Sequence, residues 1–276
     1  MSDNLLAYTH SGTVICAMIS AVWAVPFVWM ITASLRPDSG GADIASLIPQ
    51  WPLCVEYFKD ALNCADWGNL YRNTIFFSVG ILMAQLLSIT TAGYVFAFVP
   101  FRGREMVFRL FLVQLMLWPV VLMVPNMVTL KSMGLLDTLL GAMLPYMASA
   151  FGIFMVRQAL RGVPKEMIEA AQVEGANLIH IFIYVLLPAI WPTLLAFSIV
   201  SLTTHWNEYL WPLMVLSDMD THTLTIGLVS FTTSAESGAE WGLIAAGTLL
   251  VCLPITVTFI LFQKHFISSF GFTQYK

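Results

Sequence analysis

The residues that could do chemistry in this chain are few, and their spacing suits no catalytic arrangement. Serine, histidine and carboxylate residues form no hydrolytic grouping. No lysine follows a glycine, so the chain lacks the Gly-Lys pair of a phosphate-binding loop. The histidines are scattered without the short spacing of metal ligands: His10, His180, His205, His222 and His265. We therefore assign no catalytic residue and no metal site.

One short run, Trp206-Asn207-Glu208, has residue types that can bind a polar, ring-shaped ligand. An indole can stack on a sugar ring, and an amide and a carboxylate can hydrogen-bond to hydroxyl groups. The same residues also fit an ordinary role, with the tryptophan in an interfacial aromatic belt and Glu208 in a helix contact. The sequence leaves both interpretations open. Four other polar side chains in apolar stretches fit interhelical hydrogen bonds equally well: Gln85, Gln114, Asn126 and Tyr146.

The elements that position these residues are membrane-spanning helices. Hydrophobic residues make up 58% of the chain, charged residues make up 10%, and the mean hydropathy is +0.80. This composition excludes an ordinary soluble domain. Six stretches are long enough to cross about 30 Å of hydrocarbon: residues 12–35, 74–99, 107–130, 138–160, 189–213 and 241–263. We predict an all-α integral membrane protein with six transmembrane helices in one domain, residues 1–276.

The lysines and arginines predict the orientation of these helices. Eight of the 12 fall on one side: Arg102, Arg104, Arg109, Arg157, Arg161, Lys165, Lys264 and Lys276. The other side has four: Arg36, Lys59, Arg72 and Lys131. Because cytoplasmic loops carry the excess of these residues, both termini are predicted to be cytoplasmic in a multi-pass protein of the cytoplasmic membrane. The net charge of −4 gives no reason to expect nucleic-acid binding.

The longest predicted loop, residues 36–73, is extracytoplasmic. Its prolines and aromatic residues favour a partly ordered cap over a flexible linker. Cys54 and Cys64 share this loop, where an oxidising compartment would permit a disulfide, and two free thiols fit equally well. Prolines inside the predicted spans indicate kinks, which serve either bundle packing or a moving gate: Pro26, Pro119, Pro125, Pro145 and Pro254.

A polar segment, residues 161–188, lies between two spans on the predicted cytoplasmic side. Pro164 suits the first position of a helix, and Gly175 suits the residue that ends one. Glu166 and Glu169 place negative charge near the positive end of the helix dipole. A helix of about ten residues follows from these signals.

The predicted helix has a small, shallow apolar face. Its members are Met167, Ile168, Ala170 and Ala171. Such a face suits docking into a groove on a partner protein. The alternative is a helix that merely lies on the bilayer surface, but its few basic residues and the lack of a large aromatic residue on that face argue against this.

The order of motifs along the chain resembles one family. Glu169-Ala170-Ala171, three further residues, Gly175 and an apolar stretch ending in Leu187-Pro188 resemble the EAA loop of binding-protein-dependent ABC importer permeases. Further segments look like the carbohydrate-importer branch, similar to the second permease of maltose and glycerol-phosphate systems: Ser34 to Pro37, Phe101 to Arg104, Gly134 to Thr138, Trp206 to Glu208, and Leu253-Pro254. Two departures are Glu174, where the family often has Asp, and residues 270–276, which replace its Gly-rich basic tail.

The resemblance implies an ABC type I importer permease of MetI-like architecture that translocates a sugar or sugar derivative. The implied partners are a homologous second permease subunit, two ATP-binding cassette ATPase subunits, an extracytoplasmic solute-binding protein and the lipid bilayer. ATP and Mg would be bound by the ATPase, and no cofactor by this chain. By position in the motif, coupling to the ATPase would involve Glu169, Ala170, Ala171, Gly175 and Pro188 of the loop at residues 161–188.

Two other classes of protein were weighed against this one. A secondary carrier or channel for a small polar solute would be expected to carry charged side chains near the midplane of the membrane. The predicted spans contain none there. A membrane-bound enzyme would need an acid, base or metal cluster that the sequence does not provide.

Overall fold

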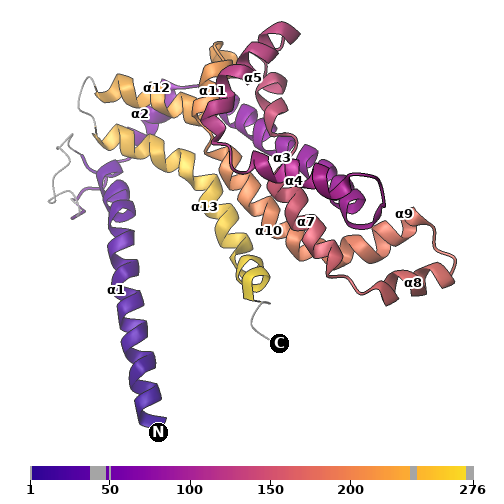
Figure 1. Ribbon diagram of the computed structural model, residues 1–276. Coiled ribbons are helices and arrows are strands. Elements are labelled where there is room, and N and C mark those ends of the chain that lie inside the picture. The colour runs from indigo at the N-terminus through magenta and orange to yellow at the C-terminus, as the bar shows by residue number, and fades with distance from the viewer. Residues whose placement is uncertain (1, 38–47, 50, 237–240, 272–276) are drawn as a thin grey trace. The chain divides into compact units, whose positions relative to one another are not determined.

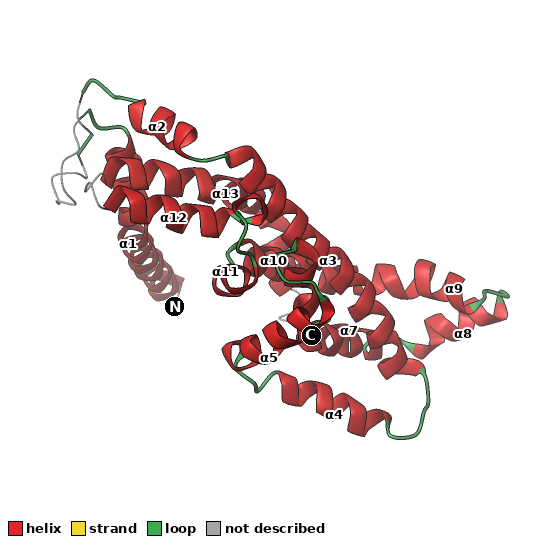
Figure 2. Cartoon of the chain, turned by 90° about the horizontal axis from the view of Figure 1, so that it is seen from above, coloured by secondary structure: helices red, strands yellow, loops and turns green. Residues whose placement is uncertain are grey.

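The computed structural model describes residues 2–37, 48–49, 51–236 and 241–271, and every regular element in these ranges is helical (Figure 1, Figure 2). The predicted all-α fold is therefore confirmed. Part of the predicted loop at residues 36–73 and most of the atypical C-terminal tail lie outside the described residues.

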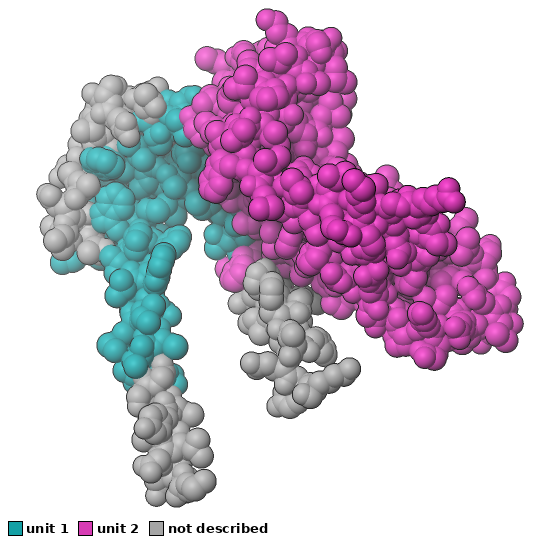
Figure 3. All heavy atoms as spheres, viewed as in Figure 1, with its two compact units in different colours: residues 1–67, 227–256 teal, residues 68–226, 257–276 magenta. Residues whose placement is uncertain are grey.

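The chain divides into two compact units, which are described separately (Figure 3). Unit 1 comprises residues 1–67 and 227–256, and unit 2 comprises residues 68–226 and 257–276. Among the described residues, four helices are long and apolar enough to cross a membrane, and the number rises to six if each of two bent helix pairs is one span.

Unit 1 contains the first two helices and parts of the last two. Its elements are α1 (Ser2–Ser34), α2 (Glu56–Cys64), most of α12 (Leu224–Glu236) and the first half of α13 (Trp241–Gly271). The α2 helix lies within the predicted loop and packs Ala61 against Leu243 and Ala246. The indole N–H of Trp67 donates to the carbonyl of Ala61 at 2.7 Å. The loop is therefore partly ordered, as predicted, and Cys54 and Cys64 are free thiols.

Two helical runs of unit 2 are long enough to span a membrane. The first is α3 (Trp67–Phe98). The second, Leu178–Trp206, joins α9 (Leu178–Ile181), a π-helical segment η3 (Phe182–Leu186) and α10 (Leu187–Trp206). The predicted span at residues 189–213 was wrong at both ends. Its helix starts earlier and ends at Trp206, and residues 210–215 form a separate helix, α11 (Leu210–Val215).

The predicted span at residues 107–130 is a broken pair. Here α4 (Arg104–Gln114) and α5 (Pro119–Met133) meet at an angle of 101°. Proline lacks the N–H that a continuing helix would need and disfavours helical geometry at the residue before it. Trp118 is accordingly extended, with ψ of 126°, and Pro119 opens a new helix.

The predicted span at residues 138–160 is also bent. A short helix α6 (Leu139–Met143) runs into a 3-10 turn η2 (Leu144–Tyr146), and α7 (Ala150–Arg161) follows at an angle of 46°. Pro145 lies in the turn, and the hydroxyl of Ser149 caps α7 by accepting from the N–H of Gly152 at 3.1 Å.

Two apolar clusters form the interior of unit 2. Cluster A joins α3, α7 and α10 through Ile89, Val156 and Phe197. Gly152 makes this approach possible, because a Cβ there would lie 2.7 Å from both Ile89 and the ring of Phe197. Cluster B lies further towards the start of α3, around Phe77, Ile81, Met123, Met143 and Trp211. Side chains in both clusters are close-packed, as in other protein interiors.

One buried cation ties α7 to α3 and α4. Arg157 is 3% exposed, and its guanidinium lies 3.8 Å from the ring centroid of Phe108. Its Nε donates to the carbonyl of Phe96 at 3.2 Å, and one terminal nitrogen lies 2.6 Å from the carboxylate of Glu105. The Glu105 carboxylate, the Phe108 ring and the Phe96 carbonyl together satisfy the buried guanidinium.

Candidate functional site

The first candidate site is the helix of the polar segment, α8 (Lys165–Val173). Pro164 is the N-cap residue of this helix. The sequence predicted it in the first helical position, so the helix begins one residue later than predicted. The helix ends as predicted, because Gly175 has φ of +83° and its N–H donates to the carbonyl of Gln172 at 3.0 Å. This left-handed conformation strains any residue with a side chain.

The predicted apolar face of α8 is divided between two sides. Ile168 and Ala171 pack inward against cluster A and are only partly exposed. Ala170 and Glu169 are exposed, Met167 is 48% exposed, and Val173 just beyond them is 89% exposed. The outward surface is therefore small and mixed in polarity, with Glu169 and Ala170 of the predicted set on it.

The outward surface of α8 is connected to the helices of unit 2 through α9. The two short helices lie side by side next to the end of α7 (Figure 1, Figure 2). Asn177 starts α9 by accepting from the N–H of His180 at 2.9 Å. Ile181, Leu186 and Ile190 then continue cluster A into α10, and Pro188 lies exposed in the first turn of that helix. The packing of α8 is therefore continuous with that of α10 through cluster A.

The second candidate site begins with a buried polar layer between the two apolar clusters. On α3, Gln85 stands one turn from Ile81 and one turn from Ile89, and it is only 4% exposed. Its amide nitrogen donates to the carbonyl of Tyr146 at 2.7 Å. The hydroxyl of Ser201 on α10 donates to its amide oxygen. In the sequence, this layer is indicated by the amide of Gln85, which stands between apolar residues one turn away on either side.

The hydrogen bonds of Gln85 determine the protonation of His205. The Tyr146 carbonyl can only accept, so the Gln85 nitrogen is correctly placed, and it lies 3.3 Å from Nε2 of His205. Nε2 must therefore accept, which leaves the proton on Nδ1 of a neutral ring. His205 is 6% exposed, and its Nδ1 has no partner among the described residues.

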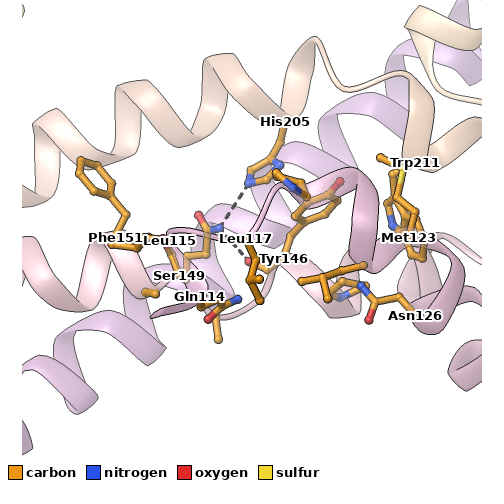
Figure 4. A pocket seen from close by; sticks show the side chains of 16 residues that line it. Gln114, Leu115, Leu117, Met123, Asn126, Tyr146, Ser149, Phe151, His205 and Trp211 are labelled. Carbon is orange, nitrogen blue, oxygen red and sulfur yellow. Dashed lines mark hydrogen bonds between the residues drawn. The ribbon is translucent and has the colours of Figure 1, made fainter. Parts of the chain in front are cut away.

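Beside this layer, the two helix breaks border an open cavity of about 340 Å³ (Figure 4). Its walls come from α3, α4, α5, η2, α7, α10 and α11, all within unit 2. Tyr146 and Phe151 supply aromatic surface, while Trp211 in the same lining is only 1% exposed. The indole N–H of Trp211 is held by the carbonyl of Ala142 at 2.8 Å, which fixes this wall.

The cavity brings together all four polar side chains that the sequence left unexplained. Gln85, Gln114, Asn126 and Tyr146 line it, together with His205. Gln85 makes the expected interhelical bonds. The amides of Gln114 and Asn126 make no hydrogen bond to any residue that the structure describes, so for these two the interhelical interpretation stays a prediction. They face the cavity as free donors and acceptors.

The run Trp206-Asn207-Glu208 lies next to this cavity without lining it. Trp206 is 7% exposed, and Asn207 donates to the carbonyl of Thr203 at 2.8 Å in its own helix. The Glu208 carboxylate lies close to the hydroxyl of Tyr146 and to the backbone N–H of Trp211. Glu208 therefore stands behind an aromatic wall of the cavity.

A third anchored feature is the loop between α5 and α6. Asp137 has φ of +60°, and its carboxylate accepts from the N–H groups of Ser217 and Asp218 at 2.7 and 2.9 Å. The bond from Asp218, followed by that from Ser217, lowers the pKa of the Asp137 carboxyl below its usual range. The anionic carboxylate thus fixes the chain after α11.

Comparisons with known proteins agree with this arrangement. A family model described as "Binding-protein-dependent transport system inner membrane component" matches residues 89–269, which include α8 and most of the cavity. A solved structure of a bacterial ABC transporter involved in the import of the acidic polysaccharide alginate superposes with a TM-score of 0.82. The superposition covers 96% of this chain and 98% of that one, at 20% identity. It shows that the fold is the same.

Curated relatives match most of the chain. The arabinooligosaccharides transport system permease protein AraQ of Halalkalibacterium halodurans is 31% identical over 92% of this chain and 91% of its own. The lactose transport system permease protein LacG of Rhizobium radiobacter is 33% identical over 88% of each. The sn-glycerol-3-phosphate transport system permease protein UgpE of Shigella flexneri is 27% identical over 93% of each.

Fold and matches together define a multi-pass membrane permease of the MetI-like architecture. The chain belongs to the family of inner membrane components of binding-protein-dependent transport systems. The family confirms the resemblance found in the sequence.

Proposed function

We propose that this chain is one of two permease subunits of an ABC importer that carries a sugar or sugar derivative across the cytoplasmic membrane. The family match over residues 89–269 carries this proposal. Its relatives are named as permeases for arabinooligosaccharides, lactose and sn-glycerol 3-phosphate, and the matched structure belongs to an alginate importer. Sugars and sugar derivatives are the common chemistry of these names.

The proposed assembly contains a second, homologous permease, two ATPase subunits and an extracytoplasmic solute-binding protein. ATP and Mg belong to the ATPase, and this chain contributes no catalytic group. Both termini are proposed to face the cytoplasm, as the lysine and arginine distribution predicts.

In this assembly α8 is the contact with the ATPase. Glu169 and Ala170 stand on its outward surface, and the glycine turn at Gly175 directs the chain back into α9. Because Ile168 and Ala171 anchor the inner side of α8 to cluster A, a movement of the ATPase would be carried to α10.

The first test is affinity purification of the tagged chain from detergent-solubilised native membranes. We expect a second permease, an ATPase with a phosphate-binding loop and a solute-binding protein to co-purify. Recovery of this chain alone, as a stable protein that transports solute by itself, would instead support a secondary carrier.

The second test is the double variant Glu169→Lys with Gly175→Arg. Charge reversal and bulk on the outward side of α8 should leave the protein inserted but reduce uptake at least about tenfold, because a docked surface tolerates an unpaired charge poorly. The matched control is Lys131→Glu with Gly134→Arg at the end of α5, where the glycine also has positive φ, +68°, and both residues are exposed. Normal uptake by a well-inserted α8 variant would contradict the assignment of α8 as the contact with the ATPase.

A further inference from the structure

The cavity of unit 2 has the size and the lining of a ligand site. Its volume of about 340 Å³ lies at the lower end of the range of roughly 300–1,000 Å³ for small-molecule sites, which suits a single ring. Tyr146 and Phe151 offer aromatic faces of the kind that stack on the C–H face of a sugar.

Its hydrogen-bonding groups are ready for a ligand. The amides of Gln114 and Asn126 each offer an acceptor and donors, and no described residue pairs with them. His205 also lines the cavity, but its Nδ1–H, held in that tautomer by Gln85, is itself closed off from solvent. Gln114 is exposed and Asn126 is half-buried, so both amides are open to a polar occupant of the cavity.

The charges around the cavity restrict that occupant. The cavity lining contains no Asp, Glu, Lys or Arg. Gln85 directs an amide hydrogen at Nε2 of His205, which opposes a second proton on the ring and so opposes a cationic histidine. The carboxylate of Glu208 stands behind Tyr146. An anionic ligand would lose its hydration here and gain no cation in return.

We propose that this cavity contacts one uncharged sugar ring of the cargo, with Gln114 and Asn126 as its hydrogen-bonding residues, and that the cargo is a neutral carbohydrate rather than a sugar phosphate or sugar acid. The inference rests on the proposed function and narrows its substrate class. It separates this chain from the relatives named for sn-glycerol 3-phosphate and from the alginate importer, whose named cargoes are anionic.

The test uses the assembled transporter in proteoliposomes with its solute-binding protein. Radiolabelled lactose and arabinotriose are the neutral probes, and sn-glycerol 3-phosphate and an alginate disaccharide are the anionic probes. Wild type should import at least one neutral probe and neither anionic probe.

Cavity variants then separate this inference from the proposed function. Asn126→Asp and Gln114→Glu should each lower neutral-probe uptake by at least about tenfold, because they introduce an unpaired carboxylate. Asn126→Leu removes the hydrogen bonds without adding charge and should lower uptake less. ATP hydrolysis stimulated by the solute-binding protein should stay within about twofold of wild type in all three, since α8 is intact.

The matched control is Asn63→Asp, the same change at an exposed amide of α2 that does not line the cavity, which should import normally. Uptake by the cavity variants equal to that of this control would overturn the inference while leaving the importer in place. Preferential import of an anionic probe by wild type would also overturn it. Failure of wild type to import any probe, with no stimulation of ATP hydrolysis, would overturn the proposed function and this inference with it.

Discussion

The same helices α3, α7 and α10 build two neighbouring regions of opposite character. At cluster A, Gly152 lets Ile89 and Phe197 approach so closely that a single added carbon would collide with both. One turn along α3, at Gln85, the interior becomes polar and opens into a cavity of about 340 Å³. The difference suggests a division of tasks. A close-packed region can transmit the displacement of α8, while an open polar region can contact the solute.

The largest expected effect on folding is at Gln85, which joins the two regions. Gln85→Leu would leave the Ser201 hydroxyl, the His205 ring and the Tyr146 carbonyl without their partner. Because each buried unsatisfied group costs about 1–3 kcal/mol, the free energy of unfolding should fall by roughly 3 kcal/mol or more. Thermal denaturation in detergent measures this.

The matched control for that variant is Gln114→Leu. It removes an amide that has no partner among the described residues, so the stability should be nearly unchanged while sugar uptake falls. Equal stability losses in the two variants would contradict the distinction between a positioning amide and a ligand-facing amide.

Gly152→Ala should break the close-packed region. Overpacking typically costs about 1–3 kcal/mol, and the gain in helix propensity is only about 1 kcal/mol, so a net loss of up to about 2 kcal/mol is expected. In Gly80→Ala the new methyl would meet the end of the Met143 side chain, which can move aside. That control should be neutral or slightly stabilising, and a stable Gly152 variant would show that cluster A is looser than described.

A smaller effect is expected at Arg157, at the end of the close-packed region. Arg157→Met keeps most of the aliphatic packing but removes the contacts with the Phe108 ring and the Phe96 carbonyl. We expect a loss of roughly 1 kcal/mol in the free energy of unfolding. A stability equal to that of wild type at both low and high salt would mean that the guanidinium contributes packing alone.

The smallest effect is the pH response of the loop held by Asp137. Because the pKa of this carboxyl is lowered in the folded protein, its stabilisation is present above the usual carboxyl pKa of about 4 and is lost as the pH falls through the lowered value. Hydrogen exchange at Ser217 and Asp218, corrected for intrinsic rates, should therefore accelerate on acidification. Asp137→Asn should already exchange quickly at neutral pH, and an unchanged rate in that variant would contradict the account.

The sequence predicted the fold more completely than the site. Hydropathy and helix-end signals located the membrane helices and the end of α8 at Gly175, because these depend on local composition and backbone geometry. The breaks before Pro119 and around Pro145 were indicated only as kinks. Their angles depend on how α4, α5 and α7 pack, which a single sequence does not report.

The cavity was foreseen only in its parts. Gln85, Gln114, Asn126 and Tyr146 stood out as polar residues in apolar stretches, but they lie on four different elements and meet only after folding. His205 was passed over because nothing nearby in the sequence marks it. The signal that could have found it is the spacing of Phe197, Ser201 and His205 on α10. These residues lie on one face of the helix, where polar side chains follow an apolar one. The division of the α8 face was also missed, since it depends on contacts with α9 and η3.

The most direct test of the division of tasks is the ratio of ATP hydrolysed to sugar imported by the assembled transporter. The α8 variant Glu169→Lys with Gly175→Arg and the cavity variant Asn126→Asp are compared with wild type in the same proteoliposomes. We predict that the α8 variant loses the response of ATP hydrolysis to the loaded solute-binding protein, while the cavity variant keeps this response and loses uptake. If both variants change hydrolysis and uptake in the same proportion, the two regions do not have separate tasks.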